Sequence, residues 1–221
     1  IAYAKQNVKI IGSDPGISAE FNGGTHMSME DIGVLRSIPE LVIYEPVDVA
    51  QFKQALPQIV AYEGPVYIRM FRKTIDDVFT DANYKFDLFG ADCIQEGTAV
   101  TIFCSGIMVQ ETMKANEILK QEGIDAEIIN IHTIKPIDRD AVVASAKKTG
   151  AVVVAENHNV IGGLTSAVCE VLMEEYPVPL RAVGVKDRFG QVGKMPFLKE
   201  EYHMTAKDIV SAVKEVIRLN K

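Results

Sequence analysis

The residues best suited to chemistry lie in one polar segment that contains several glycines, residues 12–27. This segment follows a predicted strand at residues 8–11 and precedes a predicted amphipathic helix that begins near Ser28. In open α/β sheets, ligands bind beyond the carboxyl ends of the strands, which is where the segment falls. Its polar side chains of interest are Asp14, Glu20, Asn22 and His26. An imidazole suits proton transfer near neutral pH, whereas the alternative is a solvated loop that caps the next helix.

Arg72 is the next candidate, just after a predicted strand at residues 66–70. Strand alternation puts Met70 and Arg72 on one face of the sheet, and Arg69 and Phe71 on the other. A guanidinium at the carboxyl end of a strand can hold a phosphate or a carboxylate with two parallel hydrogen bonds. The alternative is a surface ion pair, for example with the acidic segment that follows.

The other polar motifs are predicted to be structural. Residues 156–164 run from a strand into a helix through two glycines, but they match neither common nucleotide-binding glycine motif. Residues 186–193 are predicted to form a charged loop with a structural or interfacial role. His132 and His203 have no evident partner, and the sequence has no spacing typical of a metal site.

Strands that alternate with helices must position these residues. Short β-branched runs predict strands at residues 8–11, 41–44, 66–70, 99–103, 126–131, 151–155 and 180–185. Helical periodicity predicts helices at residues 47–62, 109–122, 139–148, 163–175 and 206–219, the last with a capping box at Thr205 and Asp208. The predicted fold class is therefore α/β, with two doubly wound, mainly parallel-sheet domains.

The acidic stretch between Lys73 and Asp92 interrupts this alternation and predicts a connection between domains, with the boundary near Gly90. We expect a first domain at residues 1–75, a linker at residues 76–91 and a second domain at residues 92–221. Three strands are few for a doubly wound sheet, so the first domain is expected to be incomplete at its N-terminus.

Composition excludes some classes of protein. The chain has 221 residues and a net charge of −7, which argues against a general nucleic-acid binder. No apolar run approaches the roughly 20 residues of a membrane span. The three cysteines, Cys93, Cys104 and Cys169, are far apart, and their sparse number fits a reducing, cytoplasmic location.

Six motifs in order resemble the transketolase family. They are Gly23-Gly24-Thr25-His26-Met27 with Glu30-Asp31, residues 35–39 (Leu-Arg-Ser-Ile-Pro), residues 45–48 (Glu-Pro-Val-Asp), residues 64–72 (Gly-Pro through Arg), residues 156–164 and residues 186–193. Each match alone is weak, but six in register over nearly the whole chain are specific.

The resemblance implies an architecture and a cofactor. Residues 1–75 would be the rear of the pyrimidine-binding domain, and residues 92–221 the transketolase C-terminal domain. Family members use thiamine diphosphate with Mg²⁺, and the regions that hold most of both are expected upstream of Ile1 and on a companion section or subunit. The chain alone is therefore expected to be inactive, to form a homodimer, and to aggregate or dimerise when isolated because apolar surface is exposed.

The resemblance also implies residue roles. His26 would hydrogen-bond the donor ketose as the catalytic residue, and Arg72 would hold the distal anionic group of a sugar phosphate. Asn22 stands where the family commonly has an Asp that reads an acceptor hydroxyl. Asp14 stands where the family usually has a phosphate-binding His, and it could instead pair with Arg72 or bind sugar hydroxyls. These two departures suggest substrates other than xylulose 5-phosphate and ribose 5-phosphate, and we expect His26 and Arg72 to share one sugar-sized opening.

The predicted function is the C-terminal portion of a transketolase of carbohydrate metabolism, such as the pentose phosphate pathway, that moves a two-carbon ketol unit from a ketose to an aldose. Two enzymatic alternatives share the layout: 1-deoxyxylulose-5-phosphate synthase and the beta subunit of a 2-oxo-acid dehydrogenase. The Thr-His-Met-Ser-Met-Glu-Asp run at residues 25–31 favours transketolase. A non-catalytic assembly module is the alternative from another class.

Overall fold

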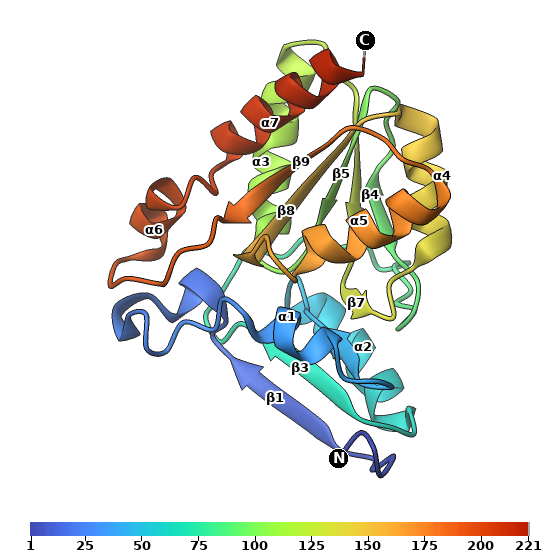
Figure 1. Ribbon diagram of the computed structural model, residues 1–221, viewed down its shortest axis with the longest axis vertical. Helices are drawn as coiled ribbons and strands as arrows, with labels where there is room; N and C mark the ends of the chain where they lie inside the picture. Colours follow the sequence, from blue (N-terminus) through green and yellow to red (C-terminus); the bar gives the residue numbers. More distant parts are fainter. Residues whose placement is uncertain (221) are drawn as a thin grey trace.

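The first sheet forms from short β-branched strands that come together from distant parts of the chain. The computed structural model describes residues 1–220, and this sheet occupies the lower part of Figure 1. Its order is β1-β3-β2-β7, with β1 and β2 both parallel to β3 and with β7 antiparallel to β2. The strands are β1 (Lys9–Ser13), β2 (Val42–Tyr44), β3 (Val66–Met70) and β7 (Thr133–Lys135).

The second sheet has the order β4-β6-β5-β8-β9 and is parallel except at β4. Its central strands are buried on both faces, which explains their continuous apolar sequences. The strands are β4 (Asp92–Gln95), β5 (Val100–Cys104), β6 (Ala126–Asn130), β8 (Val152–Asn159) and β9 (Leu180–Val185).

Helices cover both faces of the second sheet. In Figure 1, α3 and α7 lie on one face, and α4 and α5 lie on the other. The helical segments are the 3-10 helix η1 (Gly16–Asn22), α1 (Asp31–Arg36), α2 (Val49–Ala61), α3 (Met108–Gln121), α4 (Arg139–Thr149), α5 (Leu164–Glu175), α6 (Met195–Glu201) and α7 (Ala206–Leu219). The α/β class with two mainly parallel sheets is confirmed, as is the capping box of α7 between Thr205 and Asp208.

The prediction of a helix from Ser28 was wrong by three residues, because α1 begins at Asp31. The carbonyl of Ser28 accepts hydrogen bonds from the Arg69 guanidinium (3.1 Å) and from the Gly16 amide (2.9 Å), so it is engaged by distant parts of the chain. The sequence also did not predict β4, β7, η1 or α6, which are short segments.

The connection between the sheets, residues 71–91, contains no helix or strand. It is nevertheless anchored, because Phe86 and Leu88 are buried and the Asp48 carboxylate accepts hydrogen bonds from two of its amides. Residue 221, the last of the predicted second domain, lies outside the described residues. Among residues 1–220, no helix combines the length and the apolar character needed to cross a bilayer.

Candidate functional site

The carboxyl ends of β1 and β3 carry an ion pair between Asp14 and Arg72. The Asp14 amide donates to the Met70 carbonyl (2.8 Å), which fixes the carboxylate beside the strand end. The Arg72 Nε donates to Asp14 Oδ2 at 2.6 Å, its backbone amide donates to Asp14 Oδ1 at 3.2 Å, and a terminal nitrogen completes the pair. The Asp14 side chain is buried, whereas 60% of the Arg72 side chain is exposed. The pair thus presents a partly neutralised guanidinium to solvent.

A second ion pair stands beside the first, between Glu20 of η1 and Lys73. Glu20 Oε1 also accepts from the Met195 amide at 2.9 Å, which ties η1 to α6. Partial burial raises the pKa of Glu20, but the Lys73 and Met195 contacts outweigh it and lower the pKa overall. The sheet edge therefore carries two cations and two carboxylates in pairs, and its local charge is balanced.

The structure places His26 and Asn22 on the exposed part of the same segment. The His26 Nδ1 lies 2.9 Å from the Thr25 hydroxyl, and its amide donates to the Gly23 carbonyl at 3.0 Å. Among the hydrogen bonds and ion pairs of residues 1–220, none joins His26 or Asn22 to Asp14 or Arg72. A cavity of about 280 Å³ borders the segment at Met27 and Met29, but neither His26 nor Arg72 lines it. The predicted shared opening stays a prediction.

Arg69 is a fully buried guanidinium between the two sheets. It forms ion pairs with Asp31 (2.9 Å) and Glu45 (2.6 Å), and it donates to the carbonyls of Ser28 (3.1 Å) and Asn157 (2.9 Å). Burial raises the pKa of Asp31, but the Arg69 charge and its hydrogen bonds lower it overall, so this carboxyl stays ionised. One side chain therefore links β3, α1 and the end of β8.

The end of β8 meets the loop that carries Asp14. The Asn157 side chain accepts from the Ile17 amide (3.0 Å) and donates to the Pro15 carbonyl (2.9 Å). Two residues on, the Asn159 amide donates to the Met29 carbonyl at 2.8 Å. The loop before α1 is thus held at both ends by the second sheet, while its middle, which includes Asn22 and His26, is exposed.

Glu156, also on β8, holds the start of α5. Its carboxylate accepts from the amides of Leu164 (2.7 Å) and Thr165 (3.0 Å) and from the Thr165 hydroxyl (2.5 Å). Complete burial raises the pKa of Glu156 to about 7 despite these donors. The prediction of a structural turn at residues 156–164 fits this part of the segment, since these contacts cap a helix.

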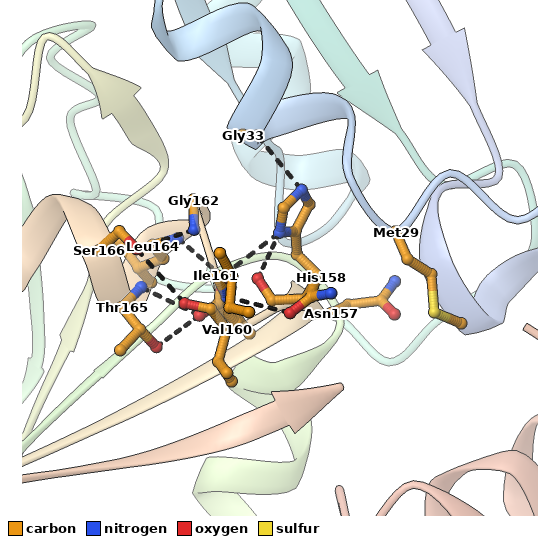
Figure 2. Close-up of polar contacts among 12 residues, drawn as sticks. Met29, Gly33, Asn157, His158, Val160, Ile161, Gly162, Leu164, Thr165 and Ser166 are labelled. Atoms are coloured by element: carbon orange, nitrogen blue, oxygen red, sulfur yellow. Dashed lines mark hydrogen bonds and ion pairs between the residues drawn. The ribbon is translucent and has the colours of Figure 1, made fainter. Parts of the chain in front are cut away.

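His158 is buried as the neutral imidazole at the seam between the sheets. Figure 2 shows its ring directed towards Gly33, whose amide lies 3.4 Å from Nε2, while Nδ1 lies 2.6 Å from the Asn159 carbonyl. Burial, together with the Arg69 charge, lowers the pKa of His158 to about 4. If His158 were protonated, its Nε2 would carry a hydrogen and could no longer accept from the Gly33 amide.

We expect His158 to contribute a loss of stability as the pH drops from about 6.5 to about 4, opposite in sign to the contribution of Glu156, whose pKa is raised. The unfolded chain, with an imidazole pKa near 6.5, binds more protons in this window than the folded chain does. In urea unfolding measured at several pH values, His158→Gln should remove up to about 3 kcal/mol of this dependence. The exposed His203→Gln is the control, and an unchanged profile in the His158 variant would rule the assignment out.

Sequence reasoning missed the roles of Arg69 and Asn157. Strand alternation predicts only which face Arg69 is on, whereas its ion pairs are with Asp31 and Glu45 from other elements. A signal for Asn157 was present, since the run Glu-Asn-His-Asn continues a strand that is otherwise apolar. Polar residues in a buried strand must find hydrogen-bond partners, and the side chains of Asn157 and His158 find theirs in the segment that follows β1.

The one group of possible metal ligands found in residues 1–220 does not suit a magnesium ion. Cys93, Glu96 and Glu127 lie within 4.8 Å of one another, the one such group found in residues 1–220. However, the Lys148 ammonium is paired with both carboxylates, at 2.5 Å from Glu96. Its positive charge occupies the place that a divalent cation would need.

Comparison with family models divides the chain in two. Residues 1–76 match the model described as the pyrimidine binding domain of transketolase, and residues 90–209 match the model described as the transketolase C-terminal domain. Together the two matches cover most of the chain.

Curated relatives match along almost the whole chain. It is 56% identical over 216 residues to the 6-deoxy-6-sulfo-D-fructose transketolase subunit SqwH of Clostridium sp. (strain MSTE9), covering 98% of this chain and 67% of that protein. It is 35% identical over 220 residues to a putative transketolase C-terminal section of Methanocaldococcus jannaschii, covering 99% of this chain and 69% of that protein. The chain therefore spans about two thirds of the length of these relatives.

A solved structure shares the fold. The chain superposes with a TM-score of 0.93 and 41% identity on a structure titled "Split gene transketolase, inactive beta4 tetramer". The match covers 100% of this chain and 70% of that one.

Proposed function

The chain belongs to the transketolase family, and from this premise we propose that it is the C-terminal subunit, or part of it, of a split transketolase. The observation that carries the proposal is its end-to-end match to relatives named as subunits or sections rather than as whole enzymes. The reaction is the transfer of a two-carbon ketol unit between a ketose and an aldose. Transfer by this chain and a companion subunit together, but by neither alone, tests the proposal.

We assign residues 1–75 to the pyrimidine-binding region, residues 76–91 to a linker and residues 92–221 to the C-terminal domain. The strand β7, from the third of these segments, pairs with β2 of the first. This strand pairing and the contact of Arg69 with Asn157 both join residues 1–75 to residues 92–221. The two domains therefore pack against each other through several elements.

A companion subunit would hold the diphosphate and the Mg²⁺ of thiamine diphosphate, the cofactor of this family. Two features of the chain support this division. The one group of possible metal ligands in residues 1–220 does not suit Mg²⁺, because Lys148 is paired with its carboxylates. In addition, β1 is an edge strand of the first sheet with Ile10 and Ile11 exposed, which suits a partner surface.

Self-association is also part of the proposal. The neighbouring structure is titled as a tetramer of its beta chain. Here Phe21 of η1 and Phe189 and Val192 of the loop after β9 are exposed, and the two segments adjoin where Gly24 approaches Gly190. Exposed apolar side chains grouped in this way are typical of an interface.

Within the site, we propose that His26 hydrogen-bonds a hydroxyl of the donor ketose and moves its proton, and that Asn22 contacts a hydroxyl of the acceptor. Both side chains are exposed in the single chain, at the carboxyl end of the first sheet. That exposure leaves both groups accessible to substrate, and a companion surface would exclude water from them.

We propose that the donor ends in a single negative charge, as a sulfonated ketose does. A phosphate monoester carries close to two charges at pH 7, and a carboxylate beside its binding group would repel it. Asp14 is such a carboxylate, and it already neutralises part of Arg72. A monoanion needs less positive charge in its binding site than a phosphate monoester does. The name of the Clostridium relative, which includes a sulfonated fructose, supports this class of donor.

In the assembled enzyme, Arg72→Met is expected to lower kcat/KM for a sulfonated ketose by about 10- to 100-fold, the value of one charge-assisted hydrogen bond. A neutral ketose should lose less than about threefold, since it has no terminal anion for the guanidinium to hold. Steady-state kinetics with both donors measure the difference. Arg139→Met, an exposed arginine paired with Glu174 and Glu175, is the matched control. Equal losses on both donors would contradict the role of Arg72.

A further inference from the structure

Asn157 belongs to the second sheet, yet its side chain contacts the first. The amide is nearly fully buried and is used in both directions: Oδ1 accepts from the Ile17 amide and Nδ2 donates to the Pro15 carbonyl. This arrangement imitates a backbone pairing and clamps the turn directly after Asp14. The backbone carbonyl of Asn157 is also used, since it accepts from Arg69. Figure 2 shows Asn157 beside His158 and facing the segment of Met29.

The turn itself is shaped to receive this side chain. Gly16 has a φ of +56°, and a Cβ there would lie 2.3 Å from Asn157 Oδ1 and 2.5 Å from its carbonyl oxygen. Only glycine allows both the backbone conformation and the approach. Asp14 also has a positive φ of 55°, a conformation that a non-glycine residue keeps only where its surroundings hold it.

We propose that Asn157 is a positioning residue for the substrate site, which sets the placement of Asp14 and, through Asp14, that of the Arg72 guanidinium. This inference rests on the function proposed above and extends it to a residue of the C-terminal domain. The chain of contacts is short: Asn157 holds Pro15 and Ile17, Pro15 follows Asp14, and Asp14 accepts three hydrogen bonds or ion-pair contacts from Arg72. Since a binding group misplaced by about 1 Å can cost about 100-fold in rate, this clamp has a functional consequence.

The first test follows the turn itself in the isolated full chain. Amide hydrogen exchange should show that Asn157→Ala raises exchange in residues 14–19 at least tenfold, while β5 and β6 exchange as before. Asn157→Asp keeps an acceptor for Ile17 but loses the donor to Pro15, so it should give a smaller rise. The control is Asn159→Ala, because the one hydrogen bond of the Asn159 side chain within residues 1–220 is from the Ile161 amide of its own loop. Unchanged exchange in the turn, or an equal rise throughout the chain, would overturn the proposal.

The second test uses the assembled enzyme and a split between KM and kcat. For Asn157→Asp we expect KM for a sulfonated ketose to rise about tenfold, with kcat and the KM of a neutral ketose within about twofold of wild type. A merely structural defect would reduce the active fraction and lower kcat equally on both donors, which would count against positioning. If the wild-type assembly transfers no ketol unit, the proposed function fails, whereas the exchange experiment still decides whether Asn157 holds the turn.

Discussion

Replacing Arg69 with methionine is expected to lower the free energy of unfolding by about 4 kcal/mol, the usual consequence of removing one partner from a buried ion pair. The two carboxylates that it pairs with, Asp31 and Glu45, are themselves buried and would be left without their counter-charge. Two backbone carbonyls on different elements would also lose a donor. Urea unfolding of the full chain, read as midpoint and slope, measures the loss.

Two companion variants make this test specific. Adding Asp31→Asn and Glu45→Gln to Arg69→Met should recover much of the loss, because the unpaired charges are gone. The loss should also shrink towards pH 5, where an unpaired buried carboxyl can take up a proton. Arg139→Met, which breaks only the two exposed ion pairs with Glu174 and Glu175, should change stability by less than about 1 kcal/mol. If Arg69→Met also lost less than about 1 kcal/mol, the conclusion that Arg69 stabilises the contact between the two sheets would be wrong.

Replacing His26 with alanine is expected to lower kcat/KM of the assembled enzyme by 10²- to 10³-fold, within the usual range for a general acid–base group. The free energy of unfolding should change by less than about 0.5 kcal/mol, since the imidazole is exposed and its one hydrogen bond within residues 1–220 is to the Thr25 hydroxyl. Steady-state kinetics and urea unfolding of the same preparation separate the two effects.

The matched control for His26 is His203→Ala, an exposed histidine whose ring lies 3.7 Å from Asp208 at the start of α7. It should retain full activity. If the two variants have the same activity, His26 has no part in the chemistry, and the reading of residues 23–27 as a site motif loses its support.

The long buried strands could be predicted from the sequence because their apolar runs are continuous. The predicted strand at residues 99–103 agrees with the fully buried β5 to within one residue, whereas β8 continues to Asn159, four residues past the predicted end at residue 155, where its sequence becomes polar. In contrast, β7 has only three residues, and its partner β2 lies about 90 positions earlier in the chain. Such a pairing is decided by tertiary packing rather than by local preference.

The candidate site shows the same limit. The pairing of Asp14 with Arg72 was anticipated as one option, because a carboxylate would repel a phosphate at that position, and the ion pair is present. The contact of Asn157 with Pro15 and Ile17 could not be read from the sequence, since 140 positions separate Asn157 from Ile17. The sequence gives residue types at the end of β8 but not which loop lies opposite them.

Glu156, Asn157, His158 and Asn159 form the link between the two halves of the molecule. Three of them contact the segment between Pro15 and Gly33, which follows β1, and Glu156 holds the start of α5. We propose that this concentration gives the C-terminal region a part in shaping the substrate site.

The most direct test of the central claim is reconstitution with the companion subunit. Ketol transfer from a sulfonated ketose to an aldose is measured with this chain alone, with the companion alone and with the two at equal concentrations, each with thiamine diphosphate and Mg²⁺. We predict at least a 100-fold higher rate for the mixture than for either subunit, and cofactor binding in titration calorimetry only when the companion is present. Turnover by this chain alone, or no transfer by the mixture, would contradict the claim that this chain is one half of a split enzyme.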